Sequence, residues 1–142
     1  MNFFVDTSFF FALANANDAD HERVRQVFEE LDLKRLPELC VTTNHVVAET
    51  ITLARDIRVL GHDSAVRLGE RLYAEKLARI HWATPEEERE AFAYFKRHHD
   101  KDYSFVDCLS FVIMGKLGIT EALAVDSDFT HRFVARPGPR PK

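Results

Sequence analysis

The chain is poor in the residues that build several common functional sites. It has two cysteines, Cys40 and Cys108, whose spacing fits neither a zinc site nor a redox pair. Each lies in an apolar segment, so both are predicted to be small buried core residues. The seven histidines include no H-E-x-x-H motif, the five glycines form no phosphate-binding loop, and no serine stands in a G-x-S-x-G motif. These absences argue against a zinc hydrolase, a P-loop nucleotide-binding protein and an α/β-hydrolase.

Long apolar runs and an excess of positive charge are also missing. No apolar run is long enough to cross a bilayer, and the first residues lack the basic region and cleavage site of a signal peptide. We therefore expect a cytoplasmic protein with no membrane partner. The formal net charge of −4 argues against a protein that holds nucleic acid on a broad basic surface. It is compatible with a nucleic-acid enzyme whose acids are neutralised by metal ions.

The chain does contain an alternation of strand-like and helical segments. Its 142 residues suit one domain, which we place at residues 1–135, followed by a proline- and arginine-rich tail at 136–142 that is predicted to be flexible. Alternating strands and helices favour a parallel sheet with helices on both faces. Strands are predicted at residues 3–5, 39–43, 79–82 and 122–125, and helices at 9–13, 24–31, 44–58, 65–77, 85–95 and 105–117.

Apolar periodicity predicts which face of each helix is buried. In the helix at 44–58 the inner face includes Leu53 and Ile57, and in the helix at 65–77 it includes Tyr73. Thr84-Pro85-Glu86-Glu87 is a capping box with proline at the first helical position. The helix that it starts is predicted to be buried through residues that include Phe92 and Phe95.

Four carboxylates stand where strands end or helices begin. Asp6 and Asp126 each follow an apolar strand, Glu49 lies in the first turns of a helix that follows a strand, and Asp107 lies in the first turn of its helix. All four are expected at the carboxyl edge of one sheet, where open α/β folds place their ligands. Clustered carboxylates repel one another, and Mg²⁺ or Mn²⁺ is the usual remedy. Such a site suits metal-assisted phosphodiester hydrolysis.

Each acid alone also has a structural explanation. Asp107 stands three residues after Ser104, which is the spacing of a capping box, and Asp6 can cap the short helix that follows it. Glu49 can be an ordinary glutamate at the edge of an apolar face. Asp126 can begin a turn. The functional interpretation therefore depends on the combination of the four.

The chain resembles the PIN-domain nucleases, and most closely the VapC-type toxins of type II toxin–antitoxin pairs. The likeness is carried by FFVDTSFFFAL, VVAET, SFVDCLSFVIM and AVDSDF, in that order, from about residue 2 to Phe133. It implies a three-layer α/β/α domain whose central parallel sheet has four or five strands. It also implies an endoribonuclease that requires Mg²⁺ or Mn²⁺, cleaves single-stranded or structured RNA, and leaves a 5′-phosphate and a 3′-hydroxyl.

The resemblance assigns roles to individual residues and partners. Asp6, Glu49, Asp107 and Asp126 match the family's catalytic and metal-binding acids, and Asp128 matches an accessory metal ligand. Thr7 and Ser8 match small polar positions beside the first acid, and Ser127 is expected to hydrogen-bond the carboxylates. The family also implies a homodimer and a cognate antitoxin protein, in which an arginine often reaches the carboxylates because a guanidinium can replace the charge of the metal.

Two other functions fit the same sequence. One is a housekeeping RNA-processing nuclease without an antitoxin, and the other is a non-catalytic RNA-binding scaffold, which the intact set of acids opposes. RNA binding is assigned to basic residues near the Asp107 helix and near the end of the chain, although for any one of them a solvated surface charge is the preferred interpretation. These residues are Lys96, Arg97, Lys101, Arg132 and, in addition, Arg136.

Overall fold

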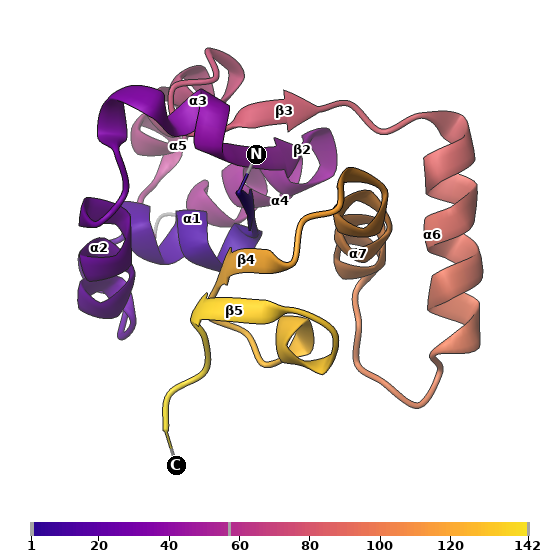
Figure 1. Ribbon diagram of the computed structural model, residues 1–142. Helices are drawn as coiled ribbons and strands as arrows, with labels where there is room; N and C mark the ends of the chain where they lie inside the picture. The colour runs from indigo at the N-terminus through magenta and orange to yellow at the C-terminus, as the bar shows by residue number, and fades with distance from the viewer. Residues whose placement is uncertain (1, 57, 142) are drawn as a thin grey trace.

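One parallel sheet of five strands occupies the centre of the computed structural model, which describes residues 2–56 and 58–141 (Figure 1). The strand order is β3-β2-β1-β4-β5, and every neighbouring pair is parallel. The predicted α/β architecture with a central parallel sheet is confirmed. The strands are β1 (Phe3–Val5), β2 (Cys40–Thr43), β3 (Arg79–His81), β4 (Glu121–Ala124) and β5 (Val134–Pro137).

The helices form two groups around this sheet. In one group α2 packs on α1, α1 packs on α4, and α4 packs on α5. In the other group α6 packs on α7 (Figure 1). The chain moves from β1 to β2 and then to β3 in one direction, and it returns through α6 and α7 to β4 on the other side of β1. The elements are α1 (Thr7–Ala14), α2 (His21–Glu29), η1 (Leu33–Arg35), α3 (Leu36–Leu39), α4 (Asn44–Ala54), α5 (His62–Tyr73), α6 (Pro85–Arg97), α7 (Phe105–Leu117) and η2 (Asp128–His131).

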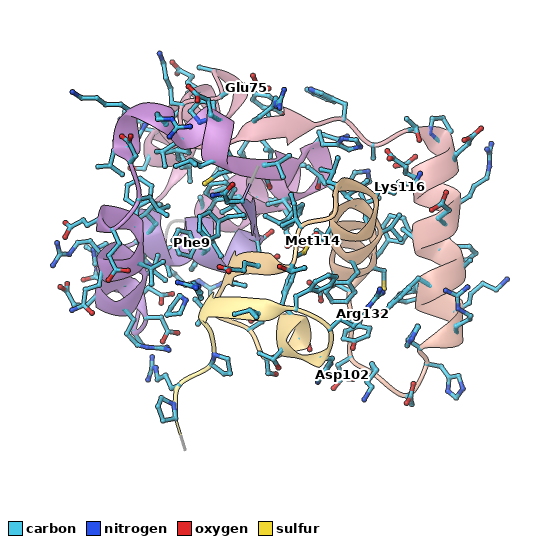
Figure 2. All side chains as sticks on the ribbon, viewed as in Figure 1. Phe9, Glu75, Asp102, Met114, Lys116 and Arg132 are labelled. Atoms are coloured by element: carbon cyan, nitrogen blue, oxygen red, sulfur yellow. The ribbon has the colours of Figure 1, made fainter. Side chains whose placement is uncertain are left out.

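The core lies between the sheet and the two helix groups, and aromatic rings form much of it. Phe4 of β1 stacks on Phe129 at a centroid distance of 6.4 Å, and Phe129 meets Phe111 of α7 edge-on at 5.1 Å. Phe9 and Met114 are 1% and 0% exposed and lie inside the molecule (Figure 2). Cys40 and Cys108 are both buried, as predicted. This packing fixes the strand ends from which the acids project.

Several residues that were predicted to face the core are exposed. Phe92 and Phe95 of α6 are 54% and 43% exposed. The reason is that α6 packs mainly on α7, through buried residues such as Ala91 and Tyr94, and among the described residues no other element packs on it to a comparable extent. Leu53 and Tyr73 are exposed as well: Leu53 lies in the wall of an open hollow, and Tyr73 stacks on Trp82, whose ring is itself exposed. The helices α4 and α5 end at Ala54 and Tyr73, earlier than predicted.

The end of the chain adds to the fold. Arg136 and Pro137 belong to β5, so the boundary predicted at residue 135 falls inside a strand. Arg23 of α2 donates hydrogen bonds to the carbonyls of Pro137 and Gly138, and Arg140 pairs with Asp20 at 2.7 Å. The predicted inner position of Ile57 lies outside the described residues. Within the described part of the chain, no helix has the length and hydropathy to cross a membrane.

Candidate active site

Asp6 lies at the carboxyl end of the central strand β1 and begins helix α1. Its carboxylate accepts hydrogen bonds from the backbone N–H of Ser8 at 3.1 Å and from Ser8 Oγ at 2.7 Å. The side chain is almost fully buried, at 2% exposure. Burial, and to a smaller extent the nearby charges of Asp107 and Asp126, raise the pKa of Asp6 to about 7, against the lowering effect of the Ser8 hydrogen bonds. The hydrogen bonds from Ser8 therefore fix the position of the Asp6 carboxylate, while burial disfavours its charged form.

Asp107 reaches the same region from the first turn of α7. A complete capping box holds it: Asp107 N–H donates to Ser104 Oγ, and Ser104 N–H donates to Asp107 Oδ2, both at 3.0 Å. Asp107 is 8% exposed, and burial together with the charges of Asp128 and Asp126 raises its pKa to about 6, against the lowering effect of the Ser104 hydrogen bonds. The structural explanation of the Ser104–Asp107 spacing is thus correct, and the same residue also belongs to the acidic cluster.

Three more acids lie near Asp6 and Asp107: Asp126 and Asp128 from the segment that follows β4, and Glu49 from α4. Asp126 follows β4, and Asp128 begins η2; carboxylate oxygens of Asp107, Asp126 and Asp128 lie within 4.8 Å of one another. Partial burial of its carboxyl group raises the pKa of Asp126, with added repulsion from Asp128 and Glu49. Glu49 is half-buried on α4. The cluster therefore draws its acids from four separate segments of the chain.

Four of these acids, Asp6, Glu49, Asp107 and Asp126, line an open cleft of about 340 Å³ at the carboxyl edge of the sheet. Because β1 connects toward β2 while β4 lies on its other side, the cleft lies at the topological switch point of the sheet, which is the usual ligand site of such folds. The lining residues are Asp6, Thr7, Ser8, Phe11, Glu49, Leu53, Ser104, Asp107 and Asp126. Among the described residues, the buried Thr7 Oγ1 has no hydrogen-bond partner, and it lies in the wall of this cleft.

The cleft carries negative charge without a protein counter-charge. Within residues 2–56 and 58–141, no lysine, arginine or histidine forms an ion pair with any of the five acids. Several carboxylates at such close range are destabilised unless a cation joins them. A set of only hard oxygen donors fits Mg²⁺ or Mn²⁺. The residues present therefore fit a divalent cation.

The structure brings most of the proposed site residues together but separates some of them. Asp6, Thr7, Ser8, Glu49, Asp107 and Asp126 line one cleft, and Asp128 joins the cluster at its rim. Ser127 is exposed, and in the described chain its carbonyl accepts a bond from Thr130 while no bond joins its hydroxyl to a carboxylate. The basic residues lie outside the cleft: Lys96 and Arg97 end α6, Lys101 is in the loop that follows, Arg132 ends η2 and Arg136 is in β5.

Sequence reasoning missed the apolar part of the cleft. Phe11 of α1 and Leu53 of α4 line it, and Leu53 is 46% exposed. Leu53 stands four residues after Glu49, so the two share one face of the helix, and that spacing was an available signal. Ser104 was recognised only as a helix cap, although it also contributes to the wall of the cleft.

The fold is a parallel α/β domain with an acidic cleft at the switch point of its sheet, and comparison with known proteins identifies the family. The chain belongs to the PIN-domain family, whose pattern matches residues 3–132. It is 39% identical over 127 residues to the 23S rRNA-specific endonuclease VapC20 of Mycobacterium tuberculosis, in strains CDC 1551 and H37Rv, covering 89% of this chain and 91% of that protein.

A solved structure agrees with this relationship. The crystal structure of M. tuberculosis VapC20, described as a sarcin–ricin loop cleaving toxin, superposes with a TM-score of 0.81 at 37% sequence identity. The match covers 92% of this chain and 94% of that chain. The similarity thus extends over nearly the whole of both proteins, and the family match at residues 3–132 includes all the segments that supply the acids.

Proposed function

We propose that the protein is a divalent-metal-dependent endoribonuclease that acts as the toxin of a toxin–antitoxin pair. The observation that carries this proposal is the cluster of carboxylates at the switch point of the sheet, of which four line an open cleft and the fifth, Asp128, lies beside Asp107 and Asp126, without a basic partner in the described residues. Membership of the PIN-domain family and similarity to an RNA endonuclease over nearly the full length support it. The cluster is intact, which counts against the non-catalytic scaffold.

Asp6, Glu49, Asp107, Asp126 and Asp128 would hold the cation. When bound, Mg²⁺ or Mn²⁺ supplies the positive charge that activates water and stabilises charge on a phosphodiester. The chain's own residues set the geometry: Ser8 orients Asp6, and the capping box at Ser104 orients Asp107. Hydrolysis is expected to leave a 5′-phosphate and a 3′-hydroxyl.

The substrate that the comparisons favour is a structured loop of 23S rRNA. The similar VapC20 proteins are described as 23S rRNA-specific and as sarcin–ricin loop cleaving, and close similarity over nearly all of both chains supports a related target. RNA loops expose unpaired bases that a protein can recognise, whereas a duplex hides them. We therefore propose a stem–loop of this type as the substrate.

The proposed partners are a cognate antitoxin and a second copy of the chain. An antitoxin that places an arginine in the cleft would supply the missing positive charge. A housekeeping nuclease would have the same cleft but no such inhibitor. Co-purification of the neighbouring small reading frame product with this protein, together with loss of cleavage on its addition, is the result expected for a toxin; cleavage that no neighbouring product inhibits would favour the housekeeping enzyme.

The experiment that tests the nuclease is a cleavage assay with purified protein. Total RNA, a stem–loop with the sarcin–ricin sequence and the same stem with a scrambled loop are each incubated with Mg²⁺, Mn²⁺ or EDTA. We expect discrete cleavage of the stem–loop that requires a metal, and analysis of the product ends identifies the 5′-phosphate. If the scrambled loop is cleaved as fast as the sarcin–ricin stem–loop, the proposed substrate is wrong. If cleavage continues in EDTA, the proposed metal dependence is wrong.

A further inference from the structure

The outer face of α6 carries exposed aromatic rings that the catalytic cleft does not use. Phe92 and Phe95 are 54% and 43% exposed. Phe92 forms part of the wall of two neighbouring hollows, one of about 560 Å³ with Phe105 and Arg89, and one of about 590 Å³ with Phe95 and the following loop. Two large rings in open hollows on one helix face are more than the scattered exposed residues of an ordinary surface.

Positive charge is interleaved with these rings. Lys96 Nζ lies 5.6 Å from the centroid of the Phe92 ring, and Lys96 and Lys101 both line the larger hollow. On the side facing η2, the guanidinium groups of Arg97 and Arg132 lie 5.7 and 5.5 Å from the Tyr94 ring. The acids that line these hollows or lie in the loop after α6 are Glu88, Asp100 and Asp102. The permanent cations Arg89, Lys96, Arg97, Lys101 and Arg132 outnumber them, in contrast to the net charge of −4 of the whole chain.

This charged and aromatic face is contiguous with the catalytic cleft. Asp102 and Tyr103 line the larger hollow, and the next residue, Ser104, lines the cleft. The Tyr103 hydroxyl lies 2.7 Å from His131 Nδ1, which ties the loop to η2, the element that begins with Asp128. Asp102 and Arg132 mark this corner in Figure 2. The α6 face and the cleft therefore meet at Tyr103 and Ser104, so an RNA bound in the cleft lies next to the α6 face.

We infer that the face formed by Phe92, Phe95, Lys96 and Lys101, the α6 surface, binds the RNA beside the scissile phosphate. Unpaired bases stack on the two phenylalanine rings, and phosphates contact the two lysines. Base stacking on aromatic side chains combined with backbone contacts to cations is the general mode of single-strand recognition. This inference rests on the proposed function, because it assigns the RNA of that reaction to a second surface.

Charge explains why RNA, rather than a second protein, is the expected occupant. The cleft repels phosphates, so a substrate needs positive charge close to it but outside the acidic cluster. Lysine is depleted at the centre of protein–protein interfaces, whereas here Lys96 and Lys101 lie among the rings. Phosphate neutralisation uses such lysines directly and makes the affinity depend on salt.

Binding is measured with the full-length protein in EDTA, so that cleavage does not interfere. The probe is a fluorescent stem–loop with the sarcin–ricin sequence, titrated at several salt concentrations. The variants are Phe92→Ala/Phe95→Ala and Lys96→Ala/Lys101→Ala. The matched controls are Tyr73→Ala, a ring that is 52% exposed on α5, and Lys34→Ala, an exposed lysine on η1. All six substituted positions are exposed, so the fold is expected to persist.

The aromatic variant is expected to bind about tenfold more weakly or worse, as for the loss of one or two stacked bases. The lysine variant is expected to reduce the slope of log affinity against log salt by about 1 to 2, corresponding to two lost phosphate contacts. Both controls are expected to match the wild-type protein. Wild-type affinity and salt slope in both α6 variants would overturn the inference.

The remaining outcomes separate this inference from the proposed function and from a protein partner. If the wild-type protein cleaves the stem–loop in metal and the α6 variants bind it and cleave it equally well, only the α6 surface assignment is wrong. If RNA binding depends on the α6 surface but no RNA is cleaved, only the nuclease proposal fails. If the aromatic variant changes the molecular mass in solution from dimer to monomer with RNA affinity unchanged, the face is a protein interface and the inference is overturned.

Discussion

Ser8 Oγ donates a hydrogen bond to Asp6 Oδ2 at 2.7 Å and accepts one from the backbone N–H of Val125 at 3.0 Å. One hydroxyl thus connects the first acid to the segment between β4 and Asp126. These bonds work against burial, because they lower the pKa of Asp6 while its surroundings raise it. The position of Ser8 explains why a small hydroxyl residue, and not only the carboxylates, belongs to the site.

Replacement of Ser8 by alanine is expected to raise the pKa of Asp6 further, because a hydrogen bond to the charged form is lost. The acid limb of the pH–activity profile should then move to higher pH. Stability should fall by about 1 kcal/mol, because the Val125 N–H loses its partner. A pH–rate profile and urea unfolding measure the two effects. Ser64→Ala, on α5, is the control, and an acid limb at the wild-type position in Ser8→Ala would contradict the assigned role.

The metal-free protein is expected to become less stable as the pH rises through the range in which Asp6 titrates. The ordinary pKa of this carboxyl is 3.8, and in the folded protein it is about 7. Below about pH 4 both states hold the proton. Between about pH 4 and 7 only the folded state holds it, so the free energy of unfolding decreases with pH, by about 1.4 kcal/mol for each pH unit at most. Above pH 7 both states have lost the proton, so Asp6 no longer makes the free energy of unfolding depend on pH.

Asp6→Asn tests this relationship because it removes the titrating group and retains a good helix cap. In EDTA at pH 7.5 the variant is expected to be more stable than the wild-type protein by about 1–4 kcal/mol, and its stability should vary less between pH 4 and 7. Urea unfolding across pH measures this. Asp32→Asn changes the cap of η1, outside the cleft, and serves as the control. A less stable Asp6→Asn protein at pH 7.5 would refute the account of burial.

Divalent cations are expected to stabilise the protein through the acidic cluster. At a Mn²⁺ concentration of about 100 times Kd, the free energy of unfolding should rise by about 2.7 kcal/mol. Asp126→Asn and Asp128→Asn should each weaken Mn²⁺ binding by about tenfold or more, measured by calorimetry without RNA. Asp63→Asn, an exposed acid at the start of α5, should bind like wild type. If Mn²⁺ leaves the wild-type melting temperature unchanged, the cluster is not a metal site.

The positions of the acids could be predicted from sequence because they depend on a simple regularity. Two buried strands stop at Asp6 and Asp126, and parallel strands bring their carboxyl ends to one edge. Ser104 caps the helix that carries Asp107, so the start of this helix can be recognised from the sequence. No assumption about packing between helices was needed for these residues.

The misplaced residues depend on packing that the local sequence does not encode. Periodicity shows that α6 has an apolar face, but it cannot show that only α7 covers the helix, which leaves Phe92 exposed. The strand β5 was missed because it is short, carries Arg136 and ends in Pro137; as an edge strand it tolerates a residue without an N–H. The bond from Val125 to Ser8 spans 117 residues, so only the folded chain reveals it.

The central claim, that the acidic cluster cleaves RNA with the help of a divalent metal, is tested most directly by Asp107→Asn. The asparagine can still accept the bond from Ser104 N–H, so α7 should remain folded, which circular dichroism checks. With the stem–loop in Mg²⁺ or Mn²⁺, cleavage is expected to slow by about a hundredfold or more relative to wild type, while Asp32→Asn cleaves normally. A folded Asp107→Asn protein that cleaves at the wild-type rate would contradict the assignment of this cleft as the active site.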